Sequence, residues 1–135
     1  MSEARQRIEA VLARAPFINE LGVRLVDVGE GWVETELEIT ERLRQQHGFV
    51  HAGVVSTLAD HTAGAAASTL VPEGRSVLTA EFTIHLLRPA GDHLRCRGEV
   101  VKLGKRLIVT QADVRSREAH CARYLGTMAL VDRGL

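Results

Sequence analysis

The sequence predicts a single α+β domain in which a curled antiparallel sheet of about six strands wraps one long central helix. Two observations support this prediction. The run of small and apolar residues from Val54 to Leu70 carries a full charge only at Asp60, so a helix formed by it must be buried. Around this run, stretches with strand-like alternation are joined by short loops, which make successive strands antiparallel neighbours.

The first twenty residues are expected to form a helical flank outside this core. Ser2 can cap a helix that runs through Ala13 and has one apolar face. Pro16 either ends that helix or opens a second short turn. The sequence shows no domain boundary, so we expect one domain over residues 1–135, with residues 1–20 acting as a lid or flank.

The first strands are expected to form a hairpin before the central helix. The segment 23–28 is strand-like, and Gly29-Glu30-Gly31 provides a turn. In the next strand, apolar residues alternate with acids, which gives one dry face and one wet face. The two sets are Val33, Thr35, Leu37 and Ile39 on the dry face and Glu34, Glu36 and Glu38 on the wet face.

Four further strands are expected after the helix, over residues 76–87, 94–103, 106–115 and 121–131. Pro89 to Asp92 turns the chain after the first of these, and Gly104-Lys105 forms a short hairpin loop. In the first strand, alternation predicts that Leu78, Ala80, Phe82, Ile84 and Leu86 share a face. Apolar residues on the sheet face away from the helix are expected to contact another subunit: Val77, Val101, Leu107 and Val109.

Composition and charge exclude several classes of partner. Seventeen basic residues balance seventeen acidic ones, so the chain has no overall field for nucleic acid or an anionic membrane. The N-terminus has charges where a secretory signal is apolar, and no stretch approaches a membrane span, so we expect a cytoplasmic protein. Cys96 and Cys121 lack metal-site spacing, and His47 and His51 have no further ligands, so no metal site is expected.

Asp60 is the first candidate for chemistry. Helical periodicity puts it in a strip of small residues, which leaves room beside its carboxyl group. An acid in such a place either makes a structural hydrogen bond or has a functional role, and the pattern alone does not choose between them. Before the helix, Gly48, Ala52 and Gly53 allow close backbone approach. Because His51 is a poor N-cap, first-turn N–H groups are expected to be free for a ligand oxygen.

The order of these residues resembles the PaaI-like branch of the hotdog-fold acyl-CoA thioesterases. The family pattern is an amide side chain, then a glycine, then His-Gly-Gly opening a helix that carries an acid further along. It is matched here by Gln45, Gly48, His51-Ala52-Gly53 and Asp60. Gln45 stands where the family commonly has Asn, and Ala52 replaces the first glycine after the histidine.

The resemblance extends from Leu21 to Val131 and implies a hotdog domain that acts on acyl-CoA without a cofactor. It implies a homodimer or a dimer of dimers. Thr79 stands where the family has a Ser or Thr that assists the acid. One alternative hypothesis is a non-catalytic acyl-CoA-binding or sensor module. A second is a hotdog hydratase or dehydratase, but the pattern argues against it because no histidine shares the face of Asp60.

The resemblance also implies roles for the site residues. The N–H of Ala52 or Gly53, at the positive end of the helix, would polarise the thioester carbonyl. Asp60 would act as general base on water or attack the carbonyl itself, since aspartate side chains are ordinarily ionised at pH 7. Thr79 would orient the water, and His51 would fix the loop or meet the leaving sulfur. Gln45 would help to hold the nucleophile.

Helix geometry adds a constraint that is independent of the family. Ala52 and Asp60 are eight positions apart in the sequence, which is about 12 Å along one helix. A single carbonyl group cannot contact both. If both act on one thioester, the N–H donor and the acid must come from different chains, with two helices antiparallel across a dimer axis.

The phosphates of coenzyme A require positive charge near the rim of the protein. Lys105 and Arg106, which lie in the predicted hairpin turn, are the preferred pair, and Arg88 is a third candidate. Solvated charges at strand ends are equally compatible with each of these residues taken singly. The sequence does not identify the acyl group.

Overall fold

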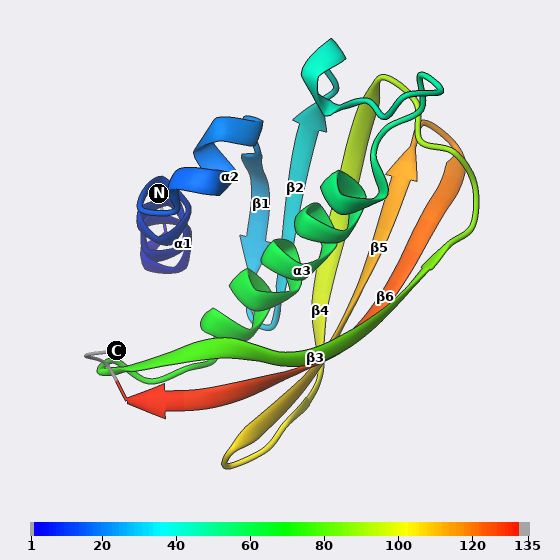
Figure 1. Ribbon diagram of the computed structural model, residues 1–135. Helices are drawn as coiled ribbons and strands as arrows, with labels where there is room; N and C mark the ends of the chain where they lie inside the picture. The colour runs from blue at the N-terminus through cyan, green and yellow to red at the C-terminus, as the bar shows by residue number, and fades with distance from the viewer. Residues whose placement is uncertain (1, 133–135) are drawn as a thin grey trace.

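The computed structural model describes residues 2–132, and within them the chain forms an α+β domain of three α-helices and six strands. These are α1 (Glu3–Ala13), α2 (Pro16–Leu21), β1 (Arg24–Gly29), β2 (Trp32–Glu38), α3 (Ala52–Ser68), β3 (Arg75–Leu86), β4 (His93–Leu103), β5 (Leu107–Ser116) and β6 (Ala119–Asp132), with a 3-10 turn at Glu41–Leu43. The strands form a single antiparallel sheet in the order β1-β2-β4-β5-β6-β3, which curls round α3 (Figure 1). The predicted fold class is confirmed.

The N-terminal helices lie beside β1, at one edge of the sheet (Figure 1). The Arg5 N–H donates to Ser2 Oγ at 3.1 Å, which caps α1 as the sequence indicates. Pro16 occupies the first turn of α2, where its missing N–H costs nothing. Ile8 is fully buried, so α1 is anchored to the core by its apolar face. None of the helices in the described part of the chain has the length and hydropathy needed to cross a bilayer.

Helix α3 lies on the concave face of the sheet. The side that faces the strands is buried and consists of Val55, Leu58, Ala59, Thr62, Ala63, Ala65, Ala66 and Ala67. A Cβ atom at Gly98 would lie 2.7 Å from the Thr62 carbonyl oxygen, so glycine is needed in β4 for the helix to approach this closely. The opposite side of α3, which includes Ser56, Asp60 and Gly64, is only partly buried. The prediction of a buried helix is therefore correct for the side of α3 that faces the sheet and wrong for the opposite side.

Strand β3 departs from the predicted alternation because it contains a bulge. Its register with β6 shifts between Thr79 and Glu81, so the inward-facing phase changes there. Before the bulge, Val77 packs against the core and Leu78 is 53% exposed, which contradicts the predicted faces of both residues. After it, Phe82 stacks on a buried tyrosine, in the predicted phase. Thr79, next to the bulge, contacts α3 through Asp60.

The outer face and one edge of the sheet are open to contact. On the sheet face away from α3, about half the surface of Val101 and of Leu107 is exposed, as the sequence indicates. Leu125 is equally exposed, whereas Val109 is only partly accessible. Strand β3 forms an edge of the sheet, so its outer backbone groups have no partner strand within residues 2–132.

Candidate active site

The carboxyl group of Asp60 is held by two hydroxyl groups. Thr79 Oγ1 donates to Asp60 Oδ1 at 2.9 Å, and the Tyr124 hydroxyl donates to the same oxygen at 2.6 Å. No hydrogen bond to Oδ2 is formed by any residue that the structure describes. The carboxylate is therefore fixed through one oxygen and has the other available for a water molecule or a substrate.

Tyr124 is a residue that the sequence analysis missed. Burial raises the pKa of its phenol well above the ordinary value of 10, and the contact with Asp60 raises it further. The phenol therefore stays protonated and donates to the carboxylate. Its ring stacks on Phe82 with centroids 5.2 Å apart, and Gly126 leaves room for it, since a Cβ atom there would lie 2.6 Å from the ring carbon Cζ. A tyrosine in the inward phase of the last strand, which needs a partner for its hydroxyl, was the available signal.

Replacing Tyr124 by Phe is expected to lower kcat about tenfold, because one of two hydrogen bonds that orient the Asp60 carboxylate is lost. The ring and its stacking on Phe82 remain, so the midpoint of thermal unfolding should change little. Unchanged kcat in Tyr124→Phe would show that Tyr124 has only a packing role.

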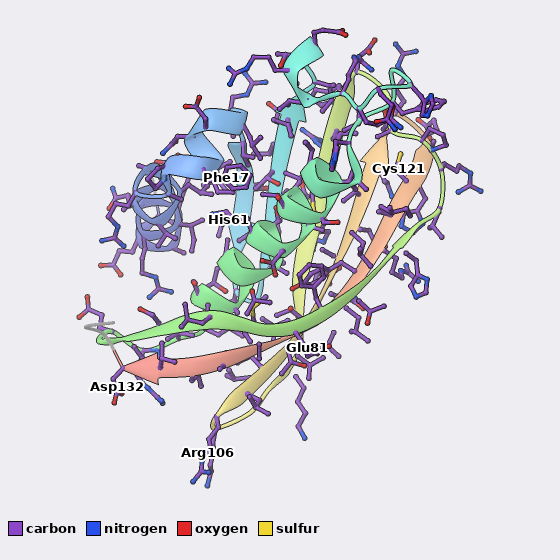
Figure 2. The ribbon with its side chains drawn as sticks, viewed as in Figure 1. Phe17, His61, Glu81, Arg106, Cys121 and Asp132 are labelled. Atoms are coloured by element: carbon purple, nitrogen blue, oxygen red, sulfur yellow. The ribbon has the colours of Figure 1, made fainter. Side chains whose placement is uncertain are left out.

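Two cavities meet at Asp60 and His61. One, of about 210 Å³, also contacts Thr79 and Met128. The other, of about 440 Å³, is bordered by α2 through Phe17 and Ile18 and by β3 through Phe82, and it includes Ser56 and Thr57. Figure 2 shows Phe17 and His61 on the side of α3 that faces the N-terminal helices. The acid thus lies next to space that is walled partly by apolar side chains.

His61 is partly buried, and its buried Nε2 atom has no hydrogen-bond partner among the residues described. Burial lowers the pKa of His61 below its ordinary value of 6.5, and the nearby charge of Asp60 opposes this effect only in part. The folded protein therefore favours the neutral imidazole.

The free energy of unfolding is expected to fall as the pH drops below 6.5, the ordinary pKa of histidine. Above that pH, His61 is neutral in both states and has no effect. Below it, the unfolded chain takes up a proton that the folded state resists, so the unfolded state is favoured. Urea unfolding from pH 8 to pH 5 should show a smaller loss for His61→Gln than for the unmodified protein. Parallel curves for the two proteins would exclude this role for His61.

The start of α3 is capped by His51. The Gly53 N–H donates to His51 Nδ1 at 2.8 Å, so the expectation that the first turn lacks a side-chain cap is wrong. A ring nitrogen that accepts a bond carries no proton, which places the proton of neutral His51 on Nε2. The Ala52 N–H makes no hydrogen bond within residues 2–132. Of the two predicted donors, Ala52 is the one that remains available.

A cavity of about 280 Å³ lies at this helix end. It is lined by Ala52 and by the loop residues that follow β3, among them Leu87, Arg88 and Pro89. Arg88 also donates to the His120 carbonyl oxygen at 3.0 Å, which fixes the guanidinium at this cavity. The Ala52 N–H and a cation therefore lie at one opening.

Gln45 organises the loop that leads into the helix. Its Oε1 atom accepts from the His47 N–H at 2.6 Å and from the Phe49 N–H at 3.2 Å. Gly48 has a φ of 87°, a left-handed conformation that glycine adopts without strain. The recorded contacts of the Gln45 oxygen are therefore in its own loop, whereas the expected role was to help hold the nucleophile.

Lys105 and Arg106 do not line the cavity at Ala52. Both are exposed in the turn between β4 and β5. Figure 2 shows Arg106 at the tip of that hairpin, pointing away from α3. A single chain thus brings Arg88 next to Ala52 but does not bring Lys105 or Arg106 there. In the described range of the chain, no group of three His, Cys, Asp or Glu side chains is placed to hold a metal ion.

Helix α3 keeps the Ala52 N–H and the Asp60 carboxylate apart. Ala52 and Asp60 both belong to α3, eight residues and about 12 Å apart along its axis. The cavity at Ala52 shares no lining residue with either cavity at Asp60. Within one chain, the available N–H and the carboxylate therefore face different spaces.

Comparison with known proteins agrees with this architecture. Residues 47–122, more than half of the chain, match the family model of the thioesterase superfamily. The chain is 25% identical to the acyl-coenzyme A thioesterase PaaI of Escherichia coli, over 83% of this chain and 79% of that protein. It is 29% identical to a 1,4-dihydroxy-2-naphthoyl-CoA hydrolase of Listeria monocytogenes, over 63% of this chain and 70% of that protein.

Solved structures show the same fold. A thioesterase family protein from Silicibacter pomeroyi is 35% identical, has a TM-score of 0.90, and is matched over 96% of this chain and 98% of its own. The PaaI protein of Escherichia coli has a TM-score of 0.87 at 24% identity, with 95% of this chain and 93% of that chain covered. The chain therefore belongs to the thioesterase superfamily, as a PaaI-like hotdog thioesterase that hydrolyses thioesters.

Proposed function

We propose that this protein hydrolyses an acyl-CoA thioester to the free acid and coenzyme A, with Asp60 as the general base. The observation that carries the proposal is the state of the Asp60 carboxylate, which is anchored through Oδ1 and open at Oδ2 beside two cavities. Relatives that are named for acyl-CoA and aryl-CoA hydrolysis support the choice of substrate class. We include a cytoplasmic location in the proposal.

The reaction follows from the groups at hand. Oδ2 of Asp60 removes a proton from water as the water oxygen attacks the thioester carbon. The carbonyl oxygen becomes an oxyanion, which the Ala52 N–H at the positive end of α3 stabilises. The intermediate then collapses, the carbon–sulfur bond breaks, and the thiolate takes up the proton to leave as coenzyme A. Direct attack by Asp60 is the alternative, and it would form an anhydride that water must then cleave.

We propose that each reaction centre is built by two chains. The distance along α3 prevents one chain from offering the Ala52 N–H and the Asp60 carboxylate to the same carbonyl. The open edge of β3, with Leu78, Phe82 and Leu86 about half exposed, is a self-complementary surface for a two-fold contact. The exposed apolar residues on the outer face of the sheet would join such dimers in pairs.

Thiol release from a panel of short, medium, long and aryl acyl-CoAs tests the activity. We expect hydrolysis of at least one class, with the acyl preference set by the cavities at Asp60. Binding of several acyl-CoAs in a thermal-shift assay without thiol release from any of them would contradict the proposal. It would favour a non-catalytic acyl-CoA sensor. Hydration of an enoyl-CoA without thiol release would favour the hydratase hypothesis.

A further inference from the structure

We propose that a cationic pocket at the C-terminal end of α3 binds the anionic end of the thioester substrate, and this inference rests on the proposed function. The pocket has a volume of about 470 Å³ and lies between α1, the end of α3 and the start of β3. Its charged lining residues are Arg7, Arg14, Arg75 and Glu73. The ligand group is a phosphate of coenzyme A or a carboxylate at the far end of the acyl chain, which present the same chemistry to arginine.

The pocket adjoins the reaction centre. It shares Val11, Ser68 and Val77 with the cavity of about 210 Å³ that is lined by Asp60, so the two cavities border each other along α3. Asp60 and Ser68 are eight residues apart on the helix, which is about 12 Å along its axis. A substrate with its carbonyl at Asp60 can therefore extend past Val11 and Val77 and place a charged end among the arginines.

The arginines of the pocket keep positive charge available for a ligand. Arg7 donates to the Ser68 carbonyl oxygen at 2.7 Å, which holds its guanidinium at the pocket. Arg14 makes no side-chain hydrogen bond or ion pair with any residue in the described range. Two acids face these three cations, Glu73 in the pocket and Asp132 beside Arg75, so a net positive charge remains.

Arg75 is incompletely paired. Its Nε atom is buried and has no hydrogen-bond partner within residues 2–132. The nearest acid oxygen, Asp132 Oδ1, lies 3.7 Å away, which is beyond hydrogen-bond distance. Guanidinium groups with unused donors recognise carboxylate and phosphate oxygens in pairs, so Arg14 and Arg75 suit a planar or tetrahedral anion.

Calorimetric titration with non-hydrolysable thioethers tests this site independently of catalysis. The ligands are hexyl-CoA, 5-carboxypentyl-CoA and the corresponding thioethers of pantetheine, which lack the nucleotide phosphates. The variants are Arg14→Ala and Arg75→Ala. The control is Arg24→Ala, because Arg24 lies in β1, outside the pocket, and pairs with Glu36. Arg14 has no side-chain bond to lose within the described range, so its variant should fold normally.

The two pocket variants are expected to raise Kd by about tenfold or more for ligands that carry the recognised anion, as expected for loss of a charge-assisted hydrogen bond. A loss for both CoA thioethers but not for the neutral pantetheine thioether identifies a phosphate. A loss confined to the carboxylated ligands identifies an acyl carboxylate. Unchanged Kd values for all ligands, or equal losses in Arg24→Ala, would overturn the inference. Absence of thiol release from acyl-CoAs would instead contradict the proposed function.

Discussion

Replacing Asp60 by Asn is expected to lower kcat by about 10²–10⁴-fold, the range found when a general base is removed. The amide has nearly the same size, and its oxygen can still accept from Thr79 and Tyr124, so the fold should be retained. What is lost is the basic oxygen that faces the cavities. The measurement is steady-state thiol release with the preferred acyl-CoA, accompanied by thermal unfolding of both proteins.

Asp27→Asn is the matched control for this variant. Asp27 lies in β1 and accepts from the Val28 N–H next to it, at 2.8 Å, so its change should leave kcat unaltered. A thioester hydrolase that kept full kcat with Asn at position 60 would remain in its family, but it would need another base. In that case the anchoring of Asp60 by Thr79 and Tyr124 would be a structural feature only.

Replacing Ala52 by Pro is expected to lower kcat by about 10²–10³-fold, because it removes the N–H that we assign to the oxyanion. Ala52 is the first residue of α3, where proline is well tolerated in a helix. His51 has φ −62° and ψ 136°, the extended conformation that a residue before proline prefers. The substitution therefore removes one donor with little cost to the helix.

Ala52→Gly is the control, because it keeps the N–H and removes only the methyl group. It should retain most of the activity and should show whether the Cβ atom that replaces a family glycine affects KM. If Ala52→Pro hydrolysed thioesters at the rate of Ala52→Gly, the oxyanion would have to be stabilised by a different group, with the Gly53 N–H as the first candidate.

The sequence was most informative where local periodicity and tertiary structure agree. The dry face of β2 and the N-cap of the N-terminal helix follow from side-chain spacing and hydrogen-bonding chemistry. The small residues of α3 indicated a buried helix, and the sheet covers one of its sides. Its other side is only partly buried and borders two cavities, which composition cannot express.

The errors in β3 and at the start of α3 have local causes. A bulge between Thr79 and Glu81 changes the inward phase of β3, and a period of two has no way of signalling one extra residue. His51 caps α3 through a ring nitrogen, an acceptor that the usual list of cap residues omits.

Long-range contacts explain what else was missed at the site. Tyr124 is 64 residues from Asp60 in the sequence, and the packing of α3 against β6 brings it to the carboxylate. The pairing of Thr79 with Asp60, expected from the family resemblance, is present as a contact between α3 and β3. The arginines of the cationic pocket come from α1, from the residue that follows it and from the start of β3, so no single stretch of the sequence marks them.

The most direct test of a reaction centre shared by two chains is complementation between the two inactive variants. Ala52→Pro and Asp60→Asn are mixed in equal amounts under conditions that exchange subunits, and thiol release is followed. In a hybrid dimer, a shared centre pairs one intact N–H with one intact carboxylate, so about a quarter of the unmodified activity should return. If the mixture stayed as inactive as its components although hybrid dimers had formed, each centre would lie within one chain and the account would be wrong.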